Sequence, residues 1–242
     1  QLSEAIRLAH RHGVRVCLAL NTLILNSELD QALAVAGAAA EAGIDAVILQ
    51  DTGLARLLHR WLPDLPLHAS TQMTVTDSAG LHLAARLGFS RVILARELSL
   101  DEIRDLTEKA RALQLETEVF IHGALCMGLS GQCLLSSLSG GRSGNRGDCA
   151  QPCRLAWTLS PSETPGDQPF PWLSPCDQSL LPALGPLAAC GVAAFKIEGR
   201  MRGPAYVGPV VAVYREVLDR IRAGNPPDRA ALSELNSRLL LA

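Results

Sequence analysis

Short apolar segments alternate with longer amphipathic segments along this chain, and this alternation most constrains its fold. The apolar segments have the length and composition of buried strands, and the segments between them have the apolar spacing of helices. Strands joined by helical crossovers pair in parallel. We therefore predict a parallel α/β sheet with strands at Val14–Leu20, Ala46–Leu49, Leu67–Ala69, Val92–Ala95, Val119–Ile121 and Ala193–Ile197.

Polar side chains follow the predicted strands where each strand ends. A (β/α) barrel gathers such strand ends around one mouth, whereas an open sheet spreads them along an edge. No glycine-rich phosphate-binding fingerprint follows the first strand, which disfavours a dinucleotide-binding sheet. We therefore predict a TIM-like barrel whose mouth carries Asn21, Gln50, Asp51, Gln72, Arg96, Glu97, His122, Glu198 and Arg200.

A closed barrel of this kind has eight βα units, and only six are found here. We predict that residues 1–203 form six of the eight units and that residues 204–242 form helices packed on them. An incomplete barrel leaves a strand at its edge, so we expect Val14–Leu20 to be an exposed edge. The chain begins at Gln1 on a helical pattern, which indicates a piece of a longer protein.

The composition of the chain limits which binding partners the protein can have. The 242 residues are 48% hydrophobic, enough for a sizeable core, and the formal net charge is −2. This charge gives no overall attraction to nucleic acid, so any RNA contact would have to be a local patch. The sequence has no apolar run of membrane-spanning length and no signal peptide, so we expect a cytoplasmic protein without membrane contact.

Cysteines cluster in the segment between the last two predicted strands, residues 123–176. Glycines, serines and arginines lie between the cysteines, so bound metal would offset the entropy lost on ordering a loop that buries little apolar surface. The spacing C-x6-C-x15-C-x3-C matches neither a zinc knuckle nor a common ferredoxin. An iron-sulfur cluster, structural zinc and cysteines that are free or paired in disulfides therefore remain open for Cys126, Cys133, Cys149 and Cys153. Cys17 and Cys190 lie in apolar segments, so we expect both to be buried thiols.

Several longer motifs resemble the collagenase-like peptidase family U32. They are G-A-L-C-M-G-L-S-G-Q-C-L-L-S from Gly123, N-R-G-D-C-A-Q-P-C-R from Asn145, F-K-I-E-G-R-M from Phe195, N-T-L from Asn21, H-A-S-T-Q-M from His68 and L-A-R-E-L-S from Leu94. The resemblance covers essentially the whole chain. It implies an iron-sulfur protein, with a 4Fe-4S cluster, that supports oxygen-independent hydroxylation. In such relatives the target is a base of tRNA or rRNA, with prephenate as co-substrate, or a step of ubiquinone synthesis.

The resemblance also implies a set of metal ligands. The first three cysteines of the segment, Cys126, Cys133 and Cys149, align with family cysteines. The fourth ligand is open between Cys153 and Cys176. Relatives carry a lysine where Cys176 stands and a thiol about three places later, where this chain has Ser179.

The strand-end residues supply candidates for catalysis and substrate binding. Arginines at a barrel mouth can receive a small anionic substrate, and neighbouring acids can orient them or transfer protons. The alternative is that these charges pair with one another at the rim and that the histidine is satisfied by the backbone. The candidates are His122, Glu97 and Glu198 for catalysis and Asn21, Gln72, Arg96 and Arg200 for substrate binding.

Three functions remain in competition. The first is an RNA hydroxylase with an iron-sulfur cluster, an anionic co-substrate and RNA as its partner, whether or not another protein assists. The second is a collagenase-like peptidase, although His68 and Ser70 have no G-x-S-x-G elbow and the chain lacks H-E-x-x-H. The third is a non-catalytic scaffold stapled by zinc. Arg142, Arg146 and Arg154 make the cysteine segment locally basic, which suits either a solvated loop or an RNA contact.

Overall fold

The sheet follows the predicted order of strands. The computed structural model describes residues 2–158, 168–200 and 202–240, so Gln1, Leu241 and Ala242 of the predicted terminal helices lie outside them. Six parallel strands are ordered β1-β2-β3-β4-β5-β7, and a short strand, β6, pairs antiparallel with the end of β5. The strands are β1 (Cys17–Leu20), β2 (Ala46–Leu49), β3 (Leu67–Ala69), β4 (Arg91–Ile93), β5 (Glu116–Gly123), β6 (Gln178–Ser179) and β7 (Ala194–Ile197). The predicted parallel sheet is confirmed.

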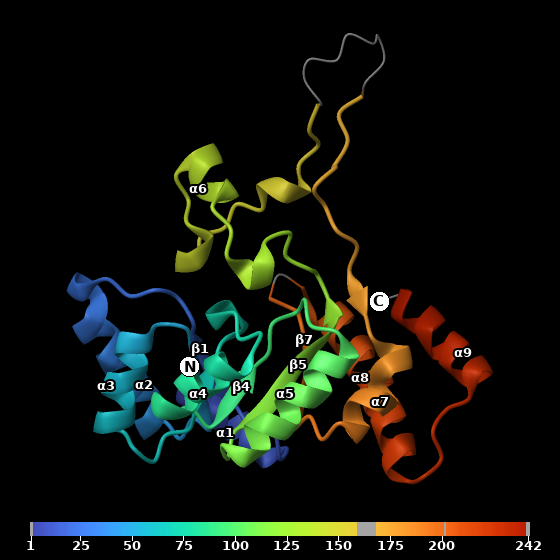
Figure 1. Ribbon diagram of the computed structural model, residues 1–242, viewed down its shortest axis with the longest axis horizontal. Helices are drawn as coiled ribbons and strands as arrows, with labels where there is room; N and C mark the ends of the chain where they lie inside the picture. The colour runs from blue at the N-terminus through green and yellow to red at the C-terminus, as the bar shows by residue number, and fades with distance from the viewer. Residues whose placement is uncertain (1, 159–167, 201, 241–242) are drawn as a thin grey trace.

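Helices connect the strands and follow the last one (Figure 1). Among the described helices, none combines the length and the apolar content needed to cross a membrane. The helices are α1 (Leu2–Arg11), α2 (Leu29–Glu41), α3 (Thr52–Trp61), α4 (Ser78–Arg86), α5 (Leu100–Ala112), α6 (Leu135–Gly140), α7 (Leu184–Ala189), α8 (Pro204–Arg222) and α9 (Arg229–Leu240).

The main core lies between one face of the sheet and the helices. Alternate strand residues such as Val47, Leu49, Val92 and Leu94 belong to a single buried cluster, together with residues of α2 to α5 and α7 to α9. Successive side chains of a strand point to opposite faces, so the residues between these core positions face away from the helices. The helices therefore cover one face of the sheet, as they do in a barrel and not in a doubly wound sheet.

The opposite face of the sheet carries charged side chains. Arg91 Nη1 lies 3.2 Å from Glu118 Oε2, and Lys196 Nζ lies 3.1 Å from Glu118 Oε1. His68, from β3, is buried beside this group, with only 6% of its surface exposed. In a (β/α) barrel the face of the sheet away from the helices forms the interior, which is usually filled with apolar side chains. In this protein that face carries a charged network instead.

The two ends of the sheet do not meet within the described residues. There, β1 pairs only with β2, and β7 pairs only with β5. The prediction that the first strand is an exposed edge is confirmed, because the other side of β1 pairs with no described strand. The predicted start of this strand at Val14 is wrong, since β1 begins at Cys17. The prediction that Cys17 and Cys190 are buried is wrong: Cys17 is exposed because it lies on the uncovered face of this edge strand, and Cys190 is partly exposed at the end of α7.

The cysteine segment stands beyond the sheet, between β5 and β6 (Figure 1). It contains α6 and several short 3₁₀ turns, and then two extended arms that project away from the body. The arms meet at an isolated antiparallel bridge between Trp157 and Phe170. The segment is thus an addition at one end of the sheet, and the helices of the core do not enclose it.

Candidate functional site

A cavity of about 410 Å³ lies between the carboxyl ends of the strands and the cysteine segment. Of the residues that the sequence nominates, eight line this cavity and four do not. The eight are Asn21, Gln72, Arg96, Cys126, Cys149, Cys153, Glu198 and Arg200. They come from positions up to 179 residues apart, from Asn21 to Arg200, and parallel strands bring them together because their carboxyl ends share one edge.

Arg96 is the central cation of the cavity. Its Nη2 lies 3.4 Å from Glu198 Oε2, and its Nη1 donates to the carbonyl of Ala124 at 3.3 Å. The guanidinium group lies over the ring of Phe120, 4.1 Å from the centroid. Its Nε is buried without a hydrogen-bond partner among the described residues. A buried donor without a partner costs free energy, so Arg96 retains capacity to bind an acceptor such as a carboxylate.

Glu198 orients the cations around it. One carboxylate oxygen faces Arg96, and the other accepts a hydrogen bond from the backbone N–H of Arg200 at 3.1 Å. The sequence suggested that Glu198 either pairs with a charge at the rim or orients a substrate-binding arginine. Its position is compatible with both, because its carboxylate pairs with Arg96 and so holds this arginine in place.

Sequence reasoning missed two further cations in the cavity, Lys196 and Arg202. Lys196 lies two residues before Glu198 on β7, so strand alternation in F-K-I-E-G-R could have placed it on the same face. Arg202 pairs with Asp177 at 3.0 Å. The lining contains five cationic side chains, including Arg154, and one carboxylate, that of Glu198. The cavity is therefore suited to an anionic ligand.

Asn21 and Gln72 form a neutral polar wall of the cavity. Asn21 Nδ2 donates to Gln72 Oε1 at 3.0 Å, and the side chain of Gln72 packs beneath Gly131 of the cysteine segment. Gly131 has a φ of +86°, and a side chain at this position would press toward Gln72. The pair therefore links the first and third strands to the roof of the cavity.

Glu97 holds the cavity wall and does not line the cavity. Its carboxylate accepts hydrogen bonds from the Ser130 backbone N–H at 2.6 Å and the Ser130 hydroxyl at 2.7 Å. Burial alone would raise the pKa of Glu97, but these hydrogen bonds outweigh burial and lower the pKa. Ser130 has a φ of 44°, a left-handed conformation that is uncommon outside glycine. We conclude that Glu97 fixes a strained turn of the roof.

His122 is turned away from the cavity lining. It is buried, and its Nδ1 lies 3.2 Å from the hydroxyl of Tyr214 on α8. Burial lowers the pKa of this imidazole, so the neutral form is favoured. The partner of the imidazole is the side chain of Tyr214, and not the backbone contact that the sequence suggested as the alternative. The position of His122 does not support a direct contact between its side chain and a substrate.

Four cysteines of the segment share one neighbourhood. Cys126, Cys149 and Cys153 line the cavity, and the Cβ of Cys133 packs close to Gly128. The carbonyl oxygen of Cys133 and the Cβ of Cys149 both lie beside Gly144, so Cys133 is next to a cysteine that lines the cavity. Burial is the main cause of the raised pKa of the Cys153 thiol; Arg154 lowers this pKa, and the three other thiols raise it.

The donor set fits a group that binds several thiolates, because Cys126, Cys149 and Cys153 line one cavity. Cys176 is exposed and does not line the cavity. Within the described residues, no three or more His, Cys, Asp or Glu side chains are arranged to hold a metal ion. Binding of a cluster therefore stays a prediction.

The arginines of the cysteine segment act as internal clamps. Arg146 pairs with Glu28 and donates to the carbonyl of Leu23, and Arg142 pairs with Asp148. Arg154 donates to three groups of the loops beside it, the hydroxyl of Ser174 and the carbonyls of Pro175 and Leu125. These contacts explain the basic character of the segment without an RNA backbone.

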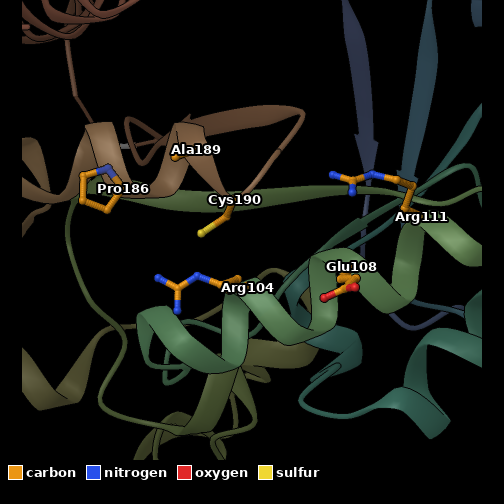
Figure 2. A pocket seen from close by; sticks show the side chains of 6 residues that line it. All are labelled: Arg104, Glu108, Arg111, Pro186, Ala189 and Cys190. Atoms are coloured by element: carbon orange, nitrogen blue, oxygen red, sulfur yellow. The ribbon is translucent and has the colours of Figure 1, made fainter.

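A smaller cavity of about 260 Å³ lies between α5 and α7. In Figure 2 the sulfur of Cys190, which directly follows α7, points toward Arg104 on α5. Arg104 already pairs with Asp101 on its own helix. This cavity lies among the outer helices, with none of the strand-end residues in its lining, so we place the functional site at the larger cavity.

The fold and the site define a class: a parallel α/β protein with helices on one face, a cationic cavity at the strand ends and a thiol-rich roof. Residues 1–240 match the model of peptidase family U32. The chain therefore belongs to this family.

Curated relatives carry two kinds of name. The chain is 39% identical over 221 residues to "23S rRNA 5-hydroxycytidine C2501 synthase" of Escherichia coli, covering 91% of this chain and 33% of that protein. It is 33% identical to "tRNA hydroxylation protein P1" of Bacillus subtilis, covering 90% of this chain and 53% of that protein. It is 32% identical to "Collagenase" of Porphyromonas gingivalis, covering 95% of this chain and 57% of that protein. The chain thus spans about a third to somewhat more than half of these relatives.

Proposed function

We propose that this chain is part of an iron-sulfur enzyme that hydroxylates an RNA base without molecular oxygen, with prephenate as the co-substrate. One observation carries the proposal: a single cavity joins a cationic floor on the strand ends to a roof of clustered thiols. Two relatives named for hydroxylation of rRNA and tRNA support RNA as the substrate.

The residues of the cavity divide into two roles. Arg96 binds a carboxylate of the co-substrate through its buried Nε and its fork of N–H groups, and Glu198 holds that fork in place. Arg200 and Lys196 add positive charge beside it. The wall of Asn21 and Gln72 offers amide groups to the neutral parts of a ligand.

The thiols of Cys126, Cys133, Cys149 and Cys153 would hold the cluster, which supplies one-electron transfer when bound. We favour Cys153 over Cys176 as the fourth ligand because Cys153 lies in the cavity beside the other thiols. The roof keeps its shape through contacts such as that of Glu97 with Ser130. Loss of the cluster is therefore expected to affect the roof more than the sheet.

Metal analysis of the full-length protein, prepared without oxygen, tests the cluster. We expect iron and acid-labile sulfide together with a broad visible absorbance. The Cys133→Ser variant should lose both while its far-ultraviolet circular dichroism is retained. Cys17→Ser is the matched control, since Cys17 is exposed at the start of β1 and does not line the cavity, and it should keep full cluster content. A full content of iron and acid-labile sulfide in the Cys133→Ser variant would refute the cluster assignment.

The fourth ligand is tested in the same preparation. Cys153→Ser should lose the cluster, and Cys176→Ser should keep it. The reverse result would assign Cys176 as the ligand, which means that the loop before β6 moves toward the roof. Stoichiometric zinc in a colourless wild-type protein would instead support the scaffold hypothesis.

Mass spectrometry of nucleosides tests the reaction. RNA from cells that lack the gene should lack one hydroxylated nucleoside, and the wild-type gene should restore it. Arg96→Gln should fail to restore it, because the buried Nε and the charge are both lost. An unchanged nucleoside profile, together with cleavage of a collagen-like peptide, would favour the peptidase that the name of one relative suggests.

A further inference from the structure

The two extended arms after the cysteine segment carry exposed aromatic side chains. We define the aromatic arms as residues 155–158 and 168–174. The whole chain has nine aromatic residues of the Phe, Trp and Tyr types, and three of them lie on these arms. Trp157 is 36% exposed, and Phe170 and Trp172 are each 54% exposed. Large apolar side chains gathered on a projecting element indicate a binding surface.

The aromatic arms hold their rings in fixed positions. Trp157 and Phe170 exchange both backbone hydrogen bonds, at 2.8 and 3.1 Å. The rings of Phe170 and Trp172 lie with centroids 4.8 Å apart and are tilted by 54°. The indole N–H of Trp157 donates to the carbonyl of Pro152 at 3.0 Å. A surface that is ordered before binding loses less conformational entropy when a ligand binds.

The foot of the aromatic arms adjoins the functional cavity. Pro152, which anchors Trp157, begins the turn that contains Cys153 and Arg154, and both of these line the cavity. Arg154 also bonds to Ser174 at the foot of the other arm. Figure 1 shows the arms extending from this point away from the sheet. A chain bound along the arms would therefore lead to the mouth of the cavity.

We infer that the aromatic arms bind unpaired bases of single-stranded RNA next to the base that enters the cavity. This inference rests on the proposed RNA hydroxylation. Bases stack on aromatic faces whatever their sequence, and cationic grooves attract the phosphates between them. The cavity beside the arms has five cationic side chains and one carboxylate. An apolar protein partner would use the aromatic rings but would gain nothing from these cations.

Binding of a short RNA tests the inference. The probe is a fluorescein-labelled oligoadenylate of about twelve nucleotides, comparable to known single-strand sites. Fluorescence anisotropy with the full-length protein would give its affinity. The double variant Phe170→Ala/Trp172→Ala should bind roughly 5- to 100-fold more weakly, as expected when stacking is removed. Trp172→Tyr should keep most of the affinity. Leu138→Ala, at an 84% exposed position of α6, is the matched control and should change nothing.

Salt dependence separates stacking from charge. Removing the rings should lower the affinity at every salt concentration without changing the slope of log affinity against log salt, because no phosphate contact is lost. A changed slope would mean that the arms act through charge and would overturn the stacking inference. Equal affinity of the double variant and the wild type would overturn it as well.

Two further outcomes separate this inference from the proposed function. If wild-type protein hydroxylates RNA and the double variant does so at the same rate and affinity, only the role of the aromatic arms fails. If the wild type neither binds nor modifies RNA, both proposals fail. Light scattering that shows a dimer in the wild type and a monomer in the double variant, with RNA binding unchanged, would assign the rings to a second copy and refute the inference.

Discussion

Lowering the pH should destabilise the protein through His68. This side chain is 6% exposed, and its Nδ1 has no hydrogen-bond partner among the described residues. Burial, followed by the positive charge of Arg91, lowers its pKa from 6.5 to about 4, although Glu118 and Glu116 act in the opposite direction. The folded protein therefore keeps His68 neutral at pH values where the unfolded chain protonates it.

The sign and size of the effect follow from this difference. Between pH 6.5 and about 4 the unfolded state binds the extra proton, so stability is fully present above pH 6.5 and is lost as pH falls toward 4. A shift from 6.5 to about 4 corresponds to about 3 kcal/mol at most. From about pH 7 to about pH 4.5 we expect a loss of roughly 2 to 3 kcal/mol from this one group.

Urea unfolding of wild type and His68→Gln at both pH values would measure the effect. Carboxylates also titrate in this range, so the informative quantity is the difference between the two proteins in their loss of unfolding free energy. The variant cannot take up the proton and should lose roughly 2 to 3 kcal/mol less than wild type. Equal losses in the two proteins would refute the assignment of a buried, neutral His68.

The remaining predictions concern the charged network and the cavity. Glu118→Gln leaves Arg91 and Lys196 without their shared carboxylate, so we expect urea unfolding to show a loss of about 3 to 5 kcal/mol. Glu116→Gln, at a side chain that is 55% exposed, should cost less than about 1 kcal/mol, and equal losses would contradict the network. Arg96→Lys keeps the charge but not the fork of donors, so calorimetric titration with prephenate should show at least about tenfold weaker binding. Unchanged affinity would exclude Arg96 from the anion site.

Local pattern was sufficient to place the strands and their polar ends. Each predicted strand is present, because short apolar runs between helical segments have few other ways to be buried. The same pattern predicted that Arg96, Glu198 and Arg200 would share one site. Alternation along β7 also contained the signal for Lys196, which the sequence analysis did not use.

Long-range partners could not be predicted in the same way. Glu97 has its partner, Ser130, 33 positions away in a left-handed turn. His122 is satisfied by Tyr214, 92 positions away on a helix whose docking face is not encoded near the histidine. A long polar side chain forms hydrogen bonds with whichever loop lies next to it in the folded protein. The local periodicity of the sequence does not indicate which loop that will be.

The sequence by itself determined the order of parallel strands, the edge where the polar residues gather and the grouping of the thiols in one segment. Only the tertiary structure decided that the helices cover one face of the sheet, that a charged network centred on Glu118 occupies the other, and that the aromatic arms stand beside the cavity. The physical reason is the range of the interactions. Strand formation and polarity follow from neighbours in the chain, whereas face coverage, ion pairing and the position of an arm depend on contacts between segments far apart in the sequence.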